Sequence, residues 1–213
     1  MKTDDLISLL AADTLPVPHR AASRRIALAL VLGVPLALLL MQMEYGVRRD
    51  LVQVMFWPMF WMKLLVPVTM GVAGFVMLQR LARPGAKVGA SWLGLAIPVL
   101  MLWAMAIVSY LMAPEDRRPD MVWGQTWRTC AMNIGIISIP IFAAAMVALK
   151  SLAPTQPARA GACAGALAGA AAAAVYALHC IELAAPFLAI WYVIGMALPA
   201  TAGALLGPRL LRW

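Results

Sequence analysis

Residues that carry chemistry are scarce in this sequence of 213 residues. It has three cysteines and no CxxC or Cys/His spacing of the zinc-site type, which excludes a disulfide scaffold and a structural zinc site. It has two histidines, His19 and His179, and no Ser/His/Asp arrangement or phosphate-binding loop. We therefore predict that the protein is not an enzyme and has no resident cofactor.

Ionisable residues are also missing from the middle of the long apolar runs. Lys63 and Arg128 come nearest, and both fall at the ends of runs, where a long side chain can reach water. Transport and proton relay usually need buried ionisable groups. This scarcity argues against a transporter or a channel.

Apolar residues are abundant: they make up 64% of the chain, and the mean hydropathy is +0.86. A soluble domain is nearer half apolar. The apolar residues form six runs that are long enough to cross a bilayer. The sequence thus predicts an all-α, polytopic membrane protein whose six-helix domain covers residues 26–213, with spans at about 26–43, 61–78, 88–112, 127–149, 160–180 and 186–206.

The net charge of +8 lies in the short loops between these runs, a distribution that favours membrane orientation over direct nucleic-acid binding. Six spans place both termini on one side. Eleven of the 17 lysines and arginines fall on that side and six on the other. Because positive residues gather on the cytoplasmic side, we predict a multi-pass membrane protein with both termini in the cytoplasm.

Residues 1–25 precede the first span and begin with a short amphipathic helix. Thr3 is a good N-cap, and acidic residues follow in the first turn, where the helix dipole favours them. Helices that rest on membranes are usually basic, whereas an acidic helix with an apolar stripe suits a basic groove on a protein. The predicted binding residues are Thr3, Asp4, Asp5, Leu6, Ile7, Leu9, Leu10 and Asp13.

The fifth run has glycine at every fourth position, Gly161, Gly165 and Gly169. Residues four apart share a helix face, so another helix can approach closely there, within the chain or in a homo-oligomer. If the helix continues to residue 180, Cys180 lies at the far end of this face. Cys130 is the cysteine at matching depth, near the start of the fourth span.

The two cysteines allow more than one interpretation. They could be a pair that is joined or ready to join in an oxidising outer compartment, or two small buried residues that never meet. They could also bind a transient metal ion, with His179 and Glu182 nearby, although helical rotation turns those two side chains away. We expect His179 and Glu182 to fix the helix end, Asn133 to make an interhelical hydrogen bond, and Cys163 to be a buried residue without a partner.

Several segments in order, MKTDDLISLLAAD, RLARPG, WRTC, YALHCIE and WYVIGM, resemble the NrsF family of six-span inner-membrane anti-sigma factors. The resemblance implies that the N-terminal segment binds an extracytoplasmic-function sigma factor. It also implies that Cys130 and Cys180 act in sensing at the periplasmic face, where a metal or an oxidant would trigger release of the sigma factor.

A membrane thiol-disulfide oxidoreductase that uses the outer cysteines is the alternative. Such enzymes usually need two cysteine pairs for electron relay, whereas this chain offers one pair. Deletion of residues 1–13 discriminates the two hypotheses, because it should free a sigma factor but leave an enzyme largely active.

Overall fold

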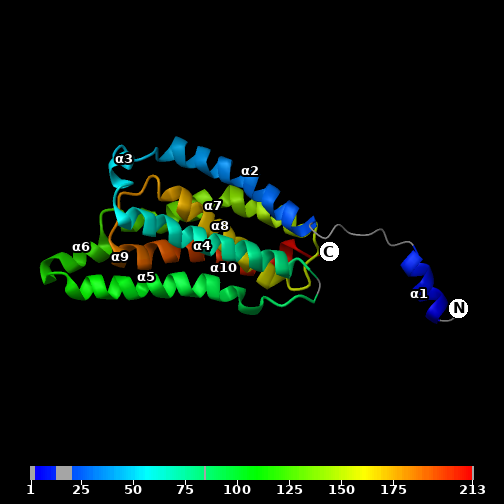
Figure 1. The fold of residues 1–213 in the computed structure, drawn as a ribbon. Coiled ribbons are helices and arrows are strands. Elements are labelled where there is room, and N and C mark those ends of the chain that lie inside the picture. Colours follow the sequence, from blue (N-terminus) through cyan, green and yellow to red (C-terminus); the bar gives the residue numbers. More distant parts are fainter. Residues whose placement is uncertain (1–2, 13–20, 84, 213) are drawn as a thin grey trace.

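The computed structural model describes residues 3–12, 21–83 and 85–212, and within these the chain contains helices and no strand. Figure 1 shows their arrangement. The helices are α1 (Thr3–Ala12), α2 (Ala21–Glu44), α3 (Leu51–Val54), α4 (Pro58–Leu81), α5 (Leu93–Met112), α6 (Arg118–Trp123), α7 (Trp127–Lys150), α8 (Pro157–Tyr176), α9 (Ala185–Phe187) and α10 (Val193–Leu210). Short 3-10 turns precede α5 and α6, and a π-helical turn, Leu188–Tyr192, joins α9 to α10.

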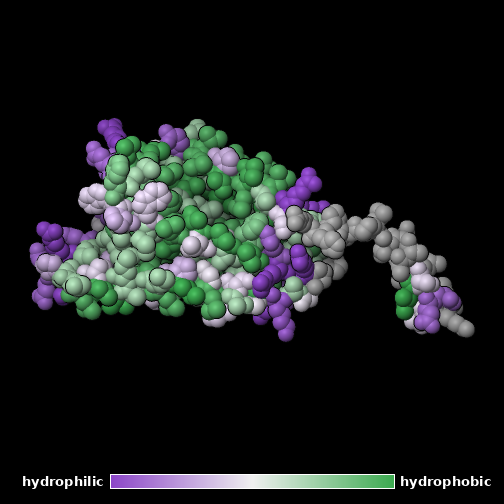
Figure 2. Space-filling view, in the orientation of Figure 1, coloured by the Kyte–Doolittle hydropathy of each residue, from purple (hydrophilic) through white to green (hydrophobic). Residues whose placement is uncertain are grey.

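Six of these helical segments are long and apolar enough to span a membrane, which confirms the predicted fold class. Each predicted span coincides with one of them. Figure 2 shows an apolar surface between two hydrophilic ends of the bundle. One end holds α3, α6 and α9, and the opposite end holds the C-terminus (Figure 1). The lipid bilayer therefore has an apolar surface to contact.

The N-terminal helix α1 forms over Thr3–Ala12, as the sequence predicts. Asp4 and Asp5 occupy its first turn and are exposed, as is Ile7. For Leu6, Leu9 and Leu10 the structure describes only the backbone. Asp13 lies outside the described residues.

Helix α8 is the central element of the bundle. Two thirds of its membrane-spanning window are buried, against about a tenth for α5. A Cβ atom added at Gly161, Gly165 or Gly169 would overlap the backbone of α10. The glycine face therefore packs against the sixth span, and the expectation that it would bring the fifth span against the fourth at Cys130 is wrong.

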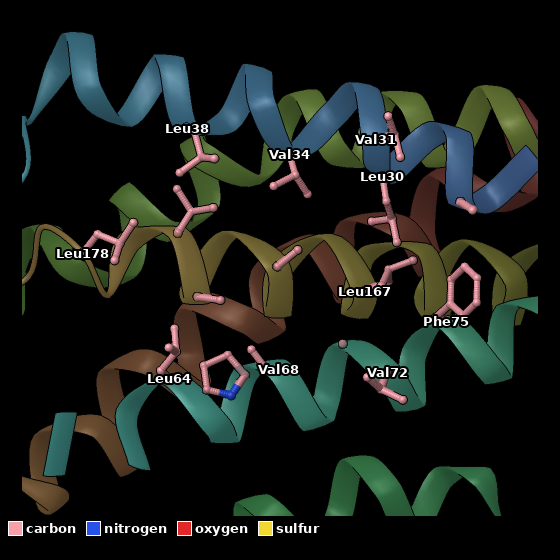
Figure 3. Close-up of a pocket in the computed structure, with 16 residues that line it drawn as sticks. Leu30, Val31, Val34, Leu38, Leu64, Val68, Val72, Phe75, Leu167 and Leu178 are labelled. Carbon is pink, nitrogen blue, oxygen red and sulfur yellow. The ribbon is translucent and has the colours of Figure 1, made fainter. Parts of the chain in front are cut away.

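An apolar groove of about 640 Å³ separates α2 from α4, with α8 as its floor. Figure 3 shows Val34 and Leu38 of α2 on one side and Leu64 and Val68 of α4 on the other. Helix α2 packs mainly against α7 and has few contacts with α4. It is thus held along one side only.

Candidate functional site

Cys130 and Cys180 lie together in the bundle. Cys130 is in the first turn of α7, and Cys180 is in the turn that follows α8. They are 0% and 1% exposed and belong to the same buried cluster, where each thiol acts on the ionisation of the other. Cys163 belongs to a separate apolar cluster with Leu78 and Leu149. The structure thus brings Cys130 and Cys180 together and leaves Cys163 apart.

Helix α8 ends at Tyr176, four residues before the predicted end of the fifth span. The chain then turns, and the backbone N–H groups of His179 and Cys180 both donate to Tyr176 O. The expectation that Cys180 lies on the glycine face of the helix is therefore wrong. Cys180 reaches Cys130 because the helix has ended and the chain can bend towards α7.

This turn is tied to the loop between α2 and α3. His179 Nδ1 donates to Gly46 O at 2.8 Å, and the Arg48 backbone N–H donates to Leu178 O at 3.1 Å. Arg48 Nη1 also donates to Cys180 O at 3.2 Å. An ion pair with Asp50, 2.7 Å long, holds the guanidinium in place and raises the pKa of Arg48. The segment just after α2 is thereby linked to Cys180 itself.

Lys63 is a buried member of the site. Its Nζ donates to Cys180 O at 2.6 Å and to Glu182 O at 2.8 Å, and the residue is 2% exposed. The prediction that Lys63 reaches water at a span end is wrong, because α4 begins at Pro58 and Lys63 lies on its inward face. Arg128, by contrast, is exposed and lies over the Trp127 ring.

Two tyrosines close the site on the side of the bundle core. The Lys63 ammonium lies 5.2 Å from the centre of the Tyr192 ring. The Tyr192 hydroxyl is buried, and it has no hydrogen-bond partner among the described residues. Asn133 Nδ2 donates to the Tyr176 hydroxyl at 3.3 Å, which is the interhelical bond that the sequence predicts for Asn133.

Glu182 joins the turn to the start of α7. Its Oε1 accepts from the backbone N–H groups of Gln125, at 2.6 Å, and Thr126, at 3.2 Å. A carboxylate at this position is favoured by the helix dipole. Gly124 leaves room for it, since a Cβ atom there would lie 2.7 Å from the Glu182 carboxyl carbon. His179 and Glu182 thus anchor the turn.

The surroundings of Cys180 favour its anionic form. The Cys130 thiol and the Lys63 ammonium lower the pKa of the Cys180 thiol below its ordinary value, although burial acts in the opposite direction. The thiolate is the reactive form of cysteine towards oxidants and disulfides. Among the described residues, no group of three His, Cys, Asp or Glu side chains converges to hold a metal ion. The site is thus suited to thiol chemistry.

Comparison with known proteins places the chain among regulators of transcription. A family model described as "Negative regulator of sigma F" (NrsF) matches residues 10–213. The "Probable anti-sigma-F factor NrsF" of Azospira oryzae is 44% identical over 213 residues, and the "Anti-sigma-F factor NrsF" of Caulobacter vibrioides is 36% identical over 214 residues, each over the full length of both chains. No solved structure matches the chain.

Proposed function

This chain belongs to the NrsF family of negative regulators of sigma F, and on that premise we propose that it sequesters an extracytoplasmic-function sigma factor at the cytoplasmic face of the bacterial inner membrane. The six apolar helices support a membrane location. The excess of lysine and arginine on the side of the termini supports a cytoplasmic N-terminus.

The N-terminal segment is the proposed contact with the sigma factor. Asp4 and Asp5 are exposed in the first turn of α1, and sigma factors carry basic DNA-binding surfaces. Opposite charges of this kind steer encounter, while the apolar face of the helix provides the area buried on binding. The residues that we propose for this interface are Thr3, Asp4, Asp5, Leu6, Ile7, Leu9, Leu10 and Asp13.

The cysteine pair is the proposed sensor, and the observation that carries this is that Cys130 and Cys180 lie together, both buried, with the Lys63 ammonium bonded to Cys180 O. A small hydroperoxide can join them. One S–S bond forms, the two S–H bonds and the O–O bond break, two electrons pass from sulfur to peroxide, and water is released. The adjacent Lys63 ammonium repels cations, so we propose oxidation rather than metal capture as the signal.

The route from the sensor to the sigma factor runs through α2. The turn that holds Cys180 is hydrogen-bonded to Gly46 and Arg48, directly after α2, and the other end of α2 leads to the N-terminal segment. Disulfide formation pulls the turn towards α7, and the groove beside α2 leaves that helix room to follow. The oxidised state must favour release by a few kcal/mol to shift the population substantially.

Co-purification with the sigma factor tests the proposal. We expect the full-length protein in detergent to retain the sigma factor of its own genome, and the protein lacking residues 1–13 to lose it. The triple variant Leu6→Asp/Leu9→Asp/Leu10→Asp should also lose it, whereas Ser8→Ala, a change at an exposed side chain of the same helix, should retain it. Equal retention by all four proteins would refute the N-terminal interface.

The sensor is tested in the same preparation. Addition of hydrogen peroxide should join Cys130 to Cys180 and release the sigma factor, and dithiothreitol should restore binding. The variant Cys130→Ser/Cys180→Ser should keep the sigma factor bound in peroxide, while Cys163→Ser should behave like the parent protein. Release from the double variant by peroxide would show that the pair is not the sensor.

A further inference from the structure

We propose that Lys63, assisted by the Tyr192 hydroxyl, forms a buried anion-stabilising site that keeps Cys180 as the thiolate and so makes Cys180, and not Cys130, the residue attacked by the oxidant. The inference rests on the proposed function of the pair and deepens it. It assigns unequal roles to two cysteines that the sequence presents as equivalent, and it gives a role to a lysine that lies within an apolar span.

Burial of a lysine in an apolar helix is costly and needs a reason. Lys63 exchanges water for Cys180 O and Glu182 O, and the centre of the Tyr192 ring lies 5.2 Å from its Nζ. Both carbonyl acceptors belong to the segment that carries the thiol. Because carbonyl oxygens accept and cannot donate, they favour the charged ammonium, which then acts as a fixed positive charge beside Cys180.

The Tyr192 hydroxyl provides the second anion-stabilising contact. It is buried on the π-helical turn that precedes α10, and among the described residues no oxygen or nitrogen pairs with it. A π-helical turn rotates side chains relative to a regular α-helix and often occurs at functional sites. Because this hydroxyl has no partner among the described residues, its O–H is available to donate to a Cys180 thiolate, whose pKa it would lower.

Cys130 has no hydrogen bond with Lys63 or Tyr192 among the described residues. It is 0% exposed in the first turn of α7, with its thiol beside that of Cys180. A neutral thiol beside a thiolate donates its proton to the anion, so Cys130 remains protonated while Cys180 is charged. The arrangement separates an attacking cysteine from a resolving cysteine, as redox-sensing pairs require.

The chemistry then follows in two balanced steps. The Cys180 thiolate attacks one oxygen of a hydroperoxide; the S–O bond forms, the O–O bond breaks, and hydroxide or alkoxide leaves. The Cys130 sulfur next attacks the sulfur of the resulting sulfenic acid; the S–S bond forms, the S–O bond breaks, and hydroxide leaves with the Cys130 proton as water. Sulfur loses two electrons in total, and the peroxide gains them.

The pH dependence of disulfide formation tests the inference. The full-length protein carrying Cys163→Ala is treated in detergent with hydrogen peroxide between pH 5 and 9, quenched with an alkylating reagent in SDS, and the Cys130–Cys180 disulfide is measured by mass spectrometry. With Lys63 present, the rate should be nearly constant from pH 6 to pH 8. With Lys63→Met, it should rise about tenfold per pH unit and be roughly thirtyfold slower at pH 7, as for an ordinary thiol with pKa of about 8.5.

Two further variants keep the test decisive if Lys63→Met does not fold. Lys63→Arg retains the charge and should retain the flat pH profile. Tyr192→Phe removes one hydroxyl and should move the midpoint up by about one pH unit, which slows the reaction at pH 5 about fivefold. A merely structural role of Lys63 would change the rate equally at every pH.

The outcomes separate this inference from the proposed function. A flat profile in Lys63→Met, or a profile in the parent that rises steeply up to pH 8.5, would overturn the role of Lys63 while the cysteine pair could still release the sigma factor. Disulfide formation with the expected profiles but without release of the sigma factor would support the role of Lys63 and refute the proposed sensor.

Discussion

A single carboxylate, that of Glu182, joins the turn after α8 to the start of α7. It accepts hydrogen bonds from the backbone N–H groups of Gln125 and Thr126. These two donors would otherwise have no partner within the helix. We expect Glu182→Ala to lower the free energy of unfolding by about 1–2 kcal/mol, because two hydrogen bonds to a charged group are lost at a helix start. Thermal unfolding in detergent measures this.

The control is Glu115→Ala, which removes a carboxylate from the same outer end. Glu115 is nearly fully exposed and forms only a long ion pair with Arg118, 3.7 Å apart. Exposed pairs contribute little, so its melting temperature should stay close to that of the parent. Equal stability of the two variants would contradict the anchoring role of Glu182.

At the residue scale the sequence identified Cys130 and Cys180 but missed Lys63. The cysteines could be matched because residue counting along two antiparallel spans fixes their depth. Whether the Lys63 side chain reaches water or turns inward depends on where α4 begins and on which face of α4 meets the core. The packing face depends on contacts with distant parts of the chain. The signal present was its distance from Pro58, a favoured first residue of a helix, which puts Lys63 more than one turn inside the span.

At the scale of elements, close packing of α8 on α10 depends on glycine. A Cβ atom at Gly165 would overlap Pro199 O, and neither backbone can move aside without separating the two helices. We expect Gly165→Ala to destabilise the protein by about 1–3 kcal/mol, as overpacking does, despite the better helix propensity of alanine. Gly71→Ala in α4 is the matched control, because its added Cβ atom would meet only Ala170 Cβ, at 3.8 Å. Destabilisation of both variants to the same extent, in an SDS titration, would contradict this assignment.

The sequence predicted all six spans from apolar length, because that property is local. It predicted neither the end of α8 nor the partner of its glycine face. The helix ends at Tyr176 because the following residues bond to the α2–α3 loop and to Lys63, and those partners lie more than 100 residues away in the chain. The stripe of small residues likewise indicates that a helix approaches, whereas the choice of α10 is made by the complementary glycines Gly203 and Gly207.

At the scale of the whole molecule, the sensor and the N-terminal segment belong to opposite ends of α2. Near its start, Arg25 Nη1 donates to Ser151 O at 2.8 Å; after its end, Arg48 contacts the turn of Cys180. Between these points α2 packs mainly on α7 and borders the groove. A helix held at both ends and along one side can transmit a displacement as a rigid body, so α2 is our candidate for the element that couples the two sites.

Arg48 is the position at which this coupling can be cut. Its side chain donates to Cys180 O and is oriented by Asp50, so Arg48→Met removes the side-chain link between α2 and the turn but leaves both thiols and Lys63 in place. We expect the variant to form the Cys130–Cys180 disulfide at a rate within about threefold of the parent, since the reacting groups are unchanged. Release of the sigma factor at a given fraction of disulfide should be reduced, because less of the displacement reaches α2.

Arg49→Met, at the exposed neighbouring residue, should release the sigma factor as the parent does. Parent-like release by Arg48→Met would show that the Arg48 side chain does not carry the signal, which would then pass through the His179–Gly46 bond or through α7, to which Glu182 ties the same turn.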